Sequence, residues 1–247
     1  MSSESYDQIA AVYATDMGQS MAFDDISYYR ALCQQRGGRA LGLGCGTGRI
    51  LLPLLQSGIN IAGVDQSPGM LAQLRTDAQA LHLQPDVSQG TLTDFSTPPC
   101  NTVLAPYSVV TYLTDESQLA AFFHTAQQAL DADGLLVVDT FIPRPVTSFT
   151  DFRLDYRRPH QQQTLQREKR IMALGSCNRI ERRYSLLDAA GAVEKSWTTV
   201  DVIRPWTEGE LVAAATAAGF ALVAKHGDFR QGSSANDQFV VLHFARS

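Results

Sequence analysis

The sequence predicts an α/β fold: a Rossmann-like, doubly wound sheet that is mostly parallel and has an antiparallel last strand. Three observations indicate this fold. Short apolar runs alternate with amphipathic segments over residues 1–142, a glycine-rich turn follows the first run, and the alternation returns after residue 204. Between these parts, period-2 stretches rich in Thr, Tyr, Val and Ile predict a small antiparallel β insertion.

The first part contains five segments of strand length. We expect strands at Arg39–Leu43, Ile59–Val64, Asp86–Gly90, Thr102–Ala105 and Leu135–Thr140. A helix begins at Asp115, because acidic residues fill its first turn. The stretch DADG predicts that this helix ends with Gly134 in the C-terminal position that tolerates positive φ.

The middle segment contains the stretches QQQTLQREKRIMAL, RIERRYSLLDAAG and AVEKSWTTVDVIR, which predict two or three antiparallel strands over the sheet. After them, Thr207 is expected to cap the helix EGELVAAATAAG, and FALVAKHG and QFVVLHFA are typical of two final strands. The chain therefore divides into a core with an N-terminal helix at 1–142, an insertion at 143–204, and the rest of the core at 205–247.

Composition and charge narrow the class of protein. Twenty Lys and Arg residues against 25 Asp and Glu give a net charge of −5, so no overall positive field attracts nucleic acid. The four cysteines lie far apart, without a Cys-x-x-Cys pair or histidines at ligand spacing, so we expect reduced thiols and no metal site. No secretory leader and no run of ~18 apolar residues is visible, which predicts a cytoplasmic protein without a membrane partner.

A glycine-rich turn follows the first predicted strand. A Cβ at Gly44, Gly46 or Gly48 would collide with a ligand or forbid the turn. Asp65 ends the second strand, where its carboxylate can accept both hydrogen bonds of a ribose diol. Together these residues indicate an adenosine-type ligand.

The spacing of the glycines separates this turn from two other nucleotide sites. A dinucleotide fingerprint requires a third glycine where Arg49 or Leu51 stands, and a P-loop requires a Gly-Lys-Ser/Thr sequence that is absent. The turn is therefore not built to hold a pyrophosphate.

The stretches LGLGCGTGR, GVDQSPGML, QGTLTDF, VLAPYSVVTYL, LDADGLLVVDTF and AAGFALV resemble the ordered motifs of class I S-adenosylmethionine-dependent methyltransferases, of the small-molecule type. The resemblance covers roughly Tyr6 to Phe244. It implies S-adenosyl-L-methionine as cofactor, with the glycine turn at the methionine part and Asp65 at the ribose. The cofactor-binding residues that it implies are Gly44, Cys45, Gly46, Gly48, Arg49, Asp65, Gln66, Met70, Thr91 and Leu92.

Two positions depart from the family pattern. Gly42 stands where relatives usually have an acid that helps to hold the cofactor's ammonium group, and Gly90–Thr91 replaces the usual Gly-Asp that accepts from adenine N6. We expect the Thr91 hydroxyl to accept the hydrogen bond from adenine N6 instead, and the Leu92 backbone amide to reach the adenine ring. Loss of a charge-assisted contact costs about 1.5–3 kcal/mol.

Methyl transfer needs positioning, exclusion of water and sometimes a base, so no triad or metal cluster is expected. Tyr13 lies in YDQIAAVYATDMG, which resembles the tyrosine-bearing lid helix of small-molecule members, and Tyr107 and Tyr112 follow the fourth strand. Asp139, near the end of the fifth strand, and His226 are candidate bases. Each of these side chains has packing or solvation as its alternative role.

The insertion is rich in arginine. If Arg157, Arg158 or Arg183 points inward, the acceptor carries a carboxylate or a phosphate. The predicted activity is methyl transfer to N or O of a small-molecule acceptor, by a monomer or homodimer with the insertion as acceptor lid. Two alternatives stay open: use of the cofactor's aminocarboxypropyl group, and a non-catalytic cofactor-binding regulatory module.

Overall fold

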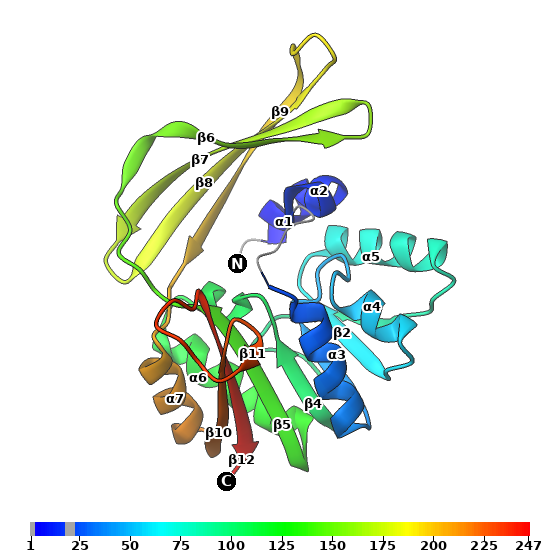
Figure 1. The fold of residues 1–247 in the computed structure, drawn as a ribbon, viewed down its shortest axis with the longest axis vertical. Helices are drawn as coiled ribbons and strands as arrows, with labels where there is room; N and C mark the ends of the chain where they lie inside the picture. The colour runs from blue at the N-terminus through cyan, green and yellow to red at the C-terminus, as the bar shows by residue number, and fades with distance from the viewer. Residues whose placement is uncertain (1–2, 18–22) are drawn as a thin grey trace.

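The computed structural model describes residues 3–17 and 23–247, which form two β-sheets with helices packed around the larger one (Figure 1). The larger sheet has the strand order β11-β10-β12-β5-β4-β1-β2-β3. Its strands are β1 (Ala40–Leu43), β2 (Ile61–Asp65), β3 (Asp86–Gln89), β4 (Cys100–Ala105), β5 (Leu130–Phe141), β10 (Phe220–Gly227), β11 (Arg230–Gln231) and β12 (Phe239–Arg246).

Strand directions in this sheet confirm the predicted fold class. The pairs β1–β2, β1–β4, β2–β3 and β4–β5 are parallel, whereas β12 runs antiparallel to both β5 and β10. The parallel strands therefore end at one edge of the sheet, where a ligand site of this fold is expected.

Helices cover both faces of the larger sheet (Figure 1). They are α3 (Asp25–Arg36), α4 (Leu51–Gln56), α5 (Pro68–Ala80), α6 (Glu116–Ala129) and α7 (Glu208–Ala217), with a 3-10 turn η2 (Val109–Tyr112). One buried cluster joins the sheet to α6 and α7 through Phe122, Phe123 and Leu211. A second cluster joins it to α3, α4 and α5 through residues such as Tyr29 and Leu74. Apolar contact on both faces explains why the strand sequences are almost continuously hydrophobic.

Of the two predicted ends of the helix that begins at Asp115, the first is confirmed and the second is wrong. Asp115 accepts a hydrogen bond from the Gln118 amide at 2.9 Å and caps α6 as expected. The prediction for Gly134 is wrong, because α6 ends at Ala129 and Gly134 lies inside β5 without a positive φ. A Cβ at Gly134 would lie 2.8 Å from Leu130 Cβ, so close packing explains this glycine.

The C-terminal elements agree with the sequence. Thr207 and Glu210 form a complete capping box at the start of α7, in which each side chain bonds to the other residue's backbone amide. The two final strands, β10 and β12, lie where they are predicted.

The smaller sheet has four antiparallel strands in the order β6-β7-β8-β9. They are β6 (Phe149–His160), β7 (Gln163–Leu174), β8 (Cys177–Leu187) and β9 (Val193–Ile203). The prediction of two or three strands missed β6, whose sequence FTDFRLDYRRPH has charges on both faces and a proline near its end. Figure 1 shows this sheet beyond the strand ends of the larger one.

Short N-terminal helices lie between the two sheets (Figure 1). The predicted lid helix is described as α1 (Ser3–Ile9), a 3-10 turn (Ala10–Val12) and α2 (Tyr13–Met17), and Gly18 lies outside the described residues. Ser5 Oγ donates to the Val200 carbonyl of β9 at 3.0 Å, and Arg158 Nη1 of β6 donates to the Thr15 carbonyl at 2.9 Å. The helices are thus bonded to the smaller sheet.

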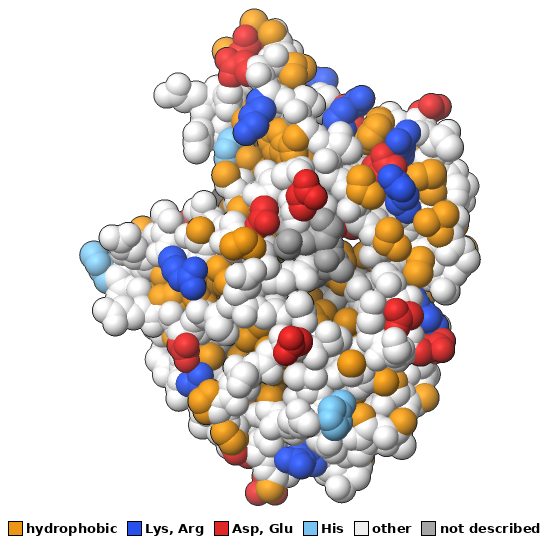
Figure 2. Space-filling view, turned by 180° about the vertical axis from the view of Figure 1, so that it is seen from behind, with side chains coloured by type: hydrophobic (Ala, Val, Ile, Leu, Met, Phe, Trp, Pro, Cys, Tyr) orange, Lys and Arg blue, Asp and Glu red, His pale blue; other side chains and the backbone are white. Residues whose placement is uncertain are grey.

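On the face of the molecule in Figure 2, Lys and Arg side chains alternate with Asp and Glu and do not gather into one patch. Among residues 3–17 and 23–247, every helix is too short or too polar to cross a membrane.

Candidate functional site

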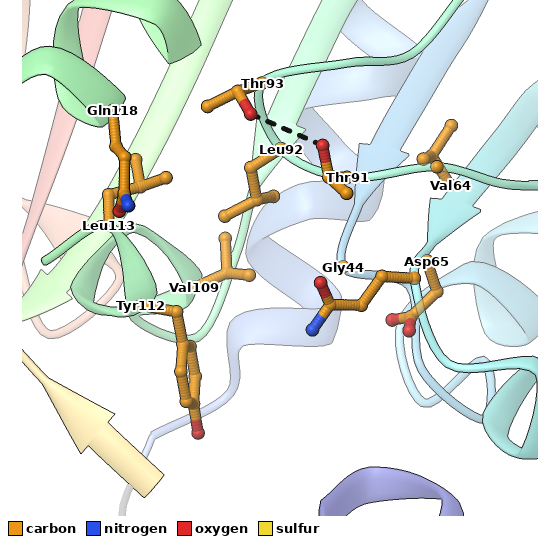
Figure 3. A pocket seen from close by; sticks show the side chains of 12 residues that line it. Gly44, Val64, Asp65, Thr91, Leu92, Thr93, Val109, Tyr112, Leu113 and Gln118 are labelled. Atoms are coloured by element: carbon orange, nitrogen blue, oxygen red, sulfur yellow. Dashed lines mark hydrogen bonds between the residues drawn. The ribbon is translucent and has the colours of Figure 1, made fainter. Parts of the chain in front are cut away.

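A cavity of about 270 Å³ opens at the carboxyl ends of β1, β2 and β3 (Figure 3). We call it the nucleoside cavity. It is lined by the glycine turn after β1, the end of β2, the loop after β3, and η2 with the residues that follow it. Its predicted lining residues are Gly44, Asp65, Gln66, Thr91 and Leu92, which the fold brings together from three segments.

The glycine turn has three glycines with positive φ, but they serve different purposes. A Cβ at Gly44 would lie 2.6 Å from Val109 Cγ2, whereas one at Gly46 would have no neighbour within 4 Å. Gly46 therefore leaves open space in front of the backbone. A Cβ at Gly48 would meet Leu52 and Leu74, so Gly48 permits helix packing instead.

Asp65 fixes the shape of this turn. Its Oδ2 accepts from the Gly46 amide at 2.8 Å, and its Oδ1 accepts from the Ser67 amide at 2.9 Å. Burial raises the pKa of Asp65, and the two amides oppose this shift. Each carboxylate oxygen keeps lone-pair capacity for a further donor, as the hydroxyls of a ribose would require.

Two further features fit an adenosine group in this cavity. Gln66 Nε2 is buried without a hydrogen-bond partner among the described residues, a costly state that a ligand acceptor would relieve. Thr91 lines the same cavity, with its hydroxyl 3.3 Å from that of Thr93. The polar atoms of this cavity therefore match the edge and the ribose of a nucleoside.

A small cavity of about 50 Å³ continues behind the glycine turn. Its lining includes Gly42, Cys45, Gly46 and Arg49. The Arg49 guanidinium donates two hydrogen bonds to Asp25 of α3, at 2.9 and 2.6 Å, and faces this cavity where the family's usual acid is missing. Burial raises the pKa of the Cys45 thiol, which therefore stays protonated.

Met70 is placed differently from the prediction that it flanks an adenine. It is 1% exposed and packs with Ile9, Val12 and Tyr184, and it is not part of the nucleoside cavity's lining. The structure gives Met70 the role of joining α5 to the N-terminal helices.

A second cavity of about 410 Å³ lies between the larger sheet and the inner face of β7, β8 and β9. We call it the lid cavity. Five tyrosines line it: Tyr6, Tyr13, Tyr107, Tyr112 and Tyr184. Tyr112 also lines the nucleoside cavity (Figure 3). Its hydroxyl bonds to that of Tyr6. Burial raises the pKa of Tyr112 to about 12, so both phenols are neutral at pH 7.

The charged groups in the lid cavity are not those considered from the sequence. Arg183 bonds to Glu168 and Arg157 to Gln166 on exposed parts of the smaller sheet, and neither lines the cavity. Arg158 binds carbonyls of α2. The lining contains instead Asp16, Arg144, Arg167, Arg182 and Asp201. Strand alternation in RIERRYSLL contained this signal, because Ile180, Arg182 and Tyr184 share one face.

Asp139 holds a loop and does not face either cavity. It is 0% exposed and accepts from the backbone amides of Tyr107 and Ser108, at 2.8 and 2.9 Å, and from the Tyr29 hydroxyl. Burial raises its pKa to about 6. These contacts make Asp139 a positioning residue for Tyr107, whose φ of 56° lies in the left-handed region.

His226 lies away from both cavities. Its Nδ1 is 2.7 Å from the Tyr28 hydroxyl of α3, which also contacts His243 Nε2 at 2.6 Å. This cluster lines a separate hollow on the α3 side of the sheet. Of the four candidate catalytic residues, the structure therefore brings together only Tyr13 and Tyr107.

Residues 3–17 and 23–247 contain no group of three or more His, Cys, Asp or Glu side chains arranged to hold a metal ion. A glycine turn opposite an acid at the end of β2, with a cavity between them, defines the fold: a Rossmann-like domain with its ligand site at the carboxyl ends of the parallel strands. Residues 40–134 match the family model described as a methyltransferase domain. The matched segment runs from β1 into β5 and contains the glycine turn and Asp65.

Known proteins extend this comparison. A Geobacillus sp. (strain WCH70) protein assigned to the methyltransferases is 31% identical over 137 residues, 54% of this chain and 53% of its own length. The ubiquinone biosynthesis O-methyltransferase of Azorhizobium caulinodans is 30% identical over 49% of this chain and 46% of its own. The match thus spans about half the length of these curated relatives.

Solved structures cover nearly the whole chain. The S-adenosylmethionine-dependent methyltransferase from Clostridium acetobutylicum ATCC 824 has a TM-score of 0.80 at 13% identity, over 98% of this chain and 99% of that one. The sugar N-methyltransferase KedS8 from Streptoalloteichus sp. has a TM-score of 0.70 at 24% identity, over 88% and 85%. At these identities the likeness shows the fold.

Proposed function

We propose that this chain is an S-adenosylmethionine-dependent methyltransferase that methylates a nitrogen or oxygen atom of a small-molecule acceptor. The observation that carries the proposal is Tyr112, which lines both the nucleoside cavity and the lid cavity. The two cavities are therefore neighbours, and group transfer requires the cofactor and the acceptor to meet beside this phenol.

Residues of the nucleoside cavity and of the small cavity beside Gly42 contact different parts of the cofactor. Asp65 accepts from the ribose hydroxyls, Gln66 and Thr91 meet the adenine, and Arg49 faces the carboxylate of the methionine part. When bound, S-adenosylmethionine supplies an activated methyl group on a positively charged sulfur. The chain needs only to hold that group in line with a nucleophile and keep water away.

The lid cavity has the size and composition of a small-molecule site. Its volume of about 410 Å³ lies in the ordinary range for such sites, and phenols and buried ion pairs stand among Ile9, Ile180 and Phe239. The β6–β9 sheet then serves as the acceptor lid that the sequence suggested. Support for N or O as the methylated atom comes from an O-methyltransferase relative and a sugar N-methyltransferase of the same fold.

Tyr112 and Tyr6 are placed to handle the acceptor's nucleophile. Both phenols are neutral and share one hydrogen bond, so Tyr112 orients a lone pair rather than acting as a strong base. Tyr13 and Tyr107 complete the wall around this point. We assign the four phenols to positioning and to the exclusion of water.

Calorimetric titration with S-adenosylmethionine, S-adenosylhomocysteine and NADH tests the cofactor assignment. We expect both sulfur nucleosides to bind and NADH not to bind, because the glycine turn lacks a pyrophosphate site. Binding of NADH alone would overturn the proposal.

The nucleoside product then separates two uses of the cofactor. Incubation with an acceptor panel, followed by mass analysis, yields S-adenosylhomocysteine after methyl transfer and methylthioadenosine after transfer of the aminocarboxypropyl group. We expect the former, because Arg49 lines the small cavity beside Gly42 and can hold the aminocarboxypropyl group by its carboxylate. Binding without turnover across the panel would identify a regulatory module.

A further inference from the structure

Asp201 stands out among the charged residues of the lid cavity. Its side chain is 4% exposed, and Oδ2 accepts from Arg182 Nη1 at 2.6 Å. Its Oδ1 is buried and has no hydrogen-bond partner among residues 3–17 and 23–247. The other buried carboxylate of this cavity, Asp16, bonds to Tyr156, Arg167 and Tyr184 and so is fully engaged.

An unpaired buried carboxylate oxygen costs a protein more than an unpaired neutral group, so proteins keep one where a ligand satisfies it. Arg182 does not remove this cost, because its bond occupies only Oδ2. Burial raises the pKa of Asp201 while Arg182 opposes that shift, as expected for a buried carboxylate that has a cation as neighbour. The free oxygen therefore requires a donor from outside the described chain.

A chain of contacts links Asp201 to the junction of the two cavities. Val200, its neighbour in β9, accepts a hydrogen bond from Ser5 Oγ at 3.0 Å. Tyr6 follows Ser5, and its hydroxyl bonds to Tyr112, which lines both cavities. A ligand group held by Asp201 thus lies on the part of the lid cavity that adjoins the nucleoside cavity.

We infer that Asp201 is a specificity-determining residue whose Oδ1 accepts a hydrogen bond from an N–H or O–H group of the acceptor. This inference rests on the proposed function, since it takes the lid cavity as the acceptor site. The acceptor class that follows is a molecule with an amino or hydroxyl group next to an apolar body, which the isoleucines and Phe239 contact. An acceptor whose polar atoms only accept hydrogen bonds would leave Oδ1 unpaired.

The substitution Asp201→Asn tests this residue sharply. Arg182 still needs an acceptor, so the amide oxygen of the variant turns to Arg182 and its NH₂ group takes the place of Oδ1. The variant therefore presents a donor where the native protein presents an acceptor, with almost unchanged volume. Glu168→Gln is the matched control, because it removes one negative charge from the same sheet at a carboxylate that bonds to Arg183 outside the cavity.

Three ring probes measure the preference on protein saturated with S-adenosylhomocysteine, by ligand-observed NMR titration: cyclohexylamine, cyclohexanol and methoxycyclohexane. We expect the native protein and Glu168→Gln to bind at least one donor probe about tenfold more tightly than the ether, the effect of one lost hydrogen bond to a charged group. In Asp201→Asn this preference disappears or reverses. Preference for the amine over the alcohol indicates an amine acceptor, and preference for the alcohol a hydroxyl acceptor.

Equal binding of all three probes to the native protein, including no binding of any, overturns the inference. So does an unchanged preference in Asp201→Asn. The affinity for S-adenosylhomocysteine, measured in the same samples, keeps this result separate from the proposed function. If the native protein does not bind S-adenosylhomocysteine, the cofactor assignment is contradicted. If it binds S-adenosylhomocysteine but binds all three probes equally, only the role of Asp201 is contradicted.

Discussion

The buried carboxyl of Asp139 makes the stability of this protein depend on pH in a direction that can be calculated. Its pKa is raised from 3.8 to about 6 by burial, against three hydrogen bonds that lower it. The folded state therefore binds a proton more tightly than the unfolded state between these two values. Stability from this group is fully present below about pH 4 and is lost as the pH rises through about 6.

The size of the effect follows from the shift. A difference of about two units corresponds to about 3 kcal/mol over the whole titration, of which about 2 kcal/mol falls between about pH 4.5 and pH 7.5. Asp139→Asn removes the titration. The variant also loses acceptors for Tyr107, Ser108 and Tyr29, which destabilises it by about 1–3 kcal/mol at every pH.

Urea unfolding of the native protein and of Asp139→Asn, at a series of pH values in this range, separates the two effects. The constant loss of hydrogen bonds cancels when the difference between the two free energies of unfolding is plotted against pH. We expect the native protein to lose about 2 kcal/mol relative to the variant as the pH rises. A flat difference, or one that grows with pH, would refute the account of Asp139 as a buried carboxyl with a raised pKa.

Three further substitutions test separate parts of the structure. Asp65→Ala should weaken S-adenosylhomocysteine binding at least about tenfold in calorimetry, because it removes both the ribose acceptor and the bond to the Gly46 amide; unchanged affinity would contradict the ribose assignment. Tyr112→Phe should lower kcat while cofactor affinity stays within about twofold, since only the hydroxyl is lost; equal kcat would remove this phenol from the transfer step. Thr207→Ala should destabilise the protein by about 1 kcal/mol in urea and leave cofactor affinity unchanged, because neither Thr207 nor Glu210 lines either cavity.

The cofactor half of the site was predictable because its contacts lie close together in the sequence. Gly44, Gly46 and Asp65 are set by two successive strands and the turn between them, so local pattern fixes their geometry. Met70 was expected beside an adenine, but the sequence does not indicate that the N-terminal helices cover this side chain. Its burial depends on Ile9 and Val12, more than fifty residues away.

Asp139 and His226 show a different limit. Both lie near the ends of strands, where catalytic residues of this fold often stand, and the sequence gives no sign of which way each side chain points. The pairing of Asp139 with Val241 of β12 and its bond to Tyr29 of α3 turn its side chain toward that helix and the loop backbone. The contact with Tyr28 turns the His226 side chain toward the same helix. Long-range strand order, which the sequence does not encode locally, determines these roles.

The acceptor half depends on the same kind of long-range order. The lid cavity takes Tyr6 and Asp16 from the N-terminal helices, Tyr107 from the core, and Arg182 and Asp201 from the smaller sheet. Alternation within β8 and β9 predicts which side chains share a face, but not which face turns to the core. The N-terminal helices decide this, because Asp16 binds Arg167 and Tyr184 and so selects one face of the sheet. The N-terminal helices therefore orient the smaller sheet, and the proposed acceptor specificity depends on the contact between them.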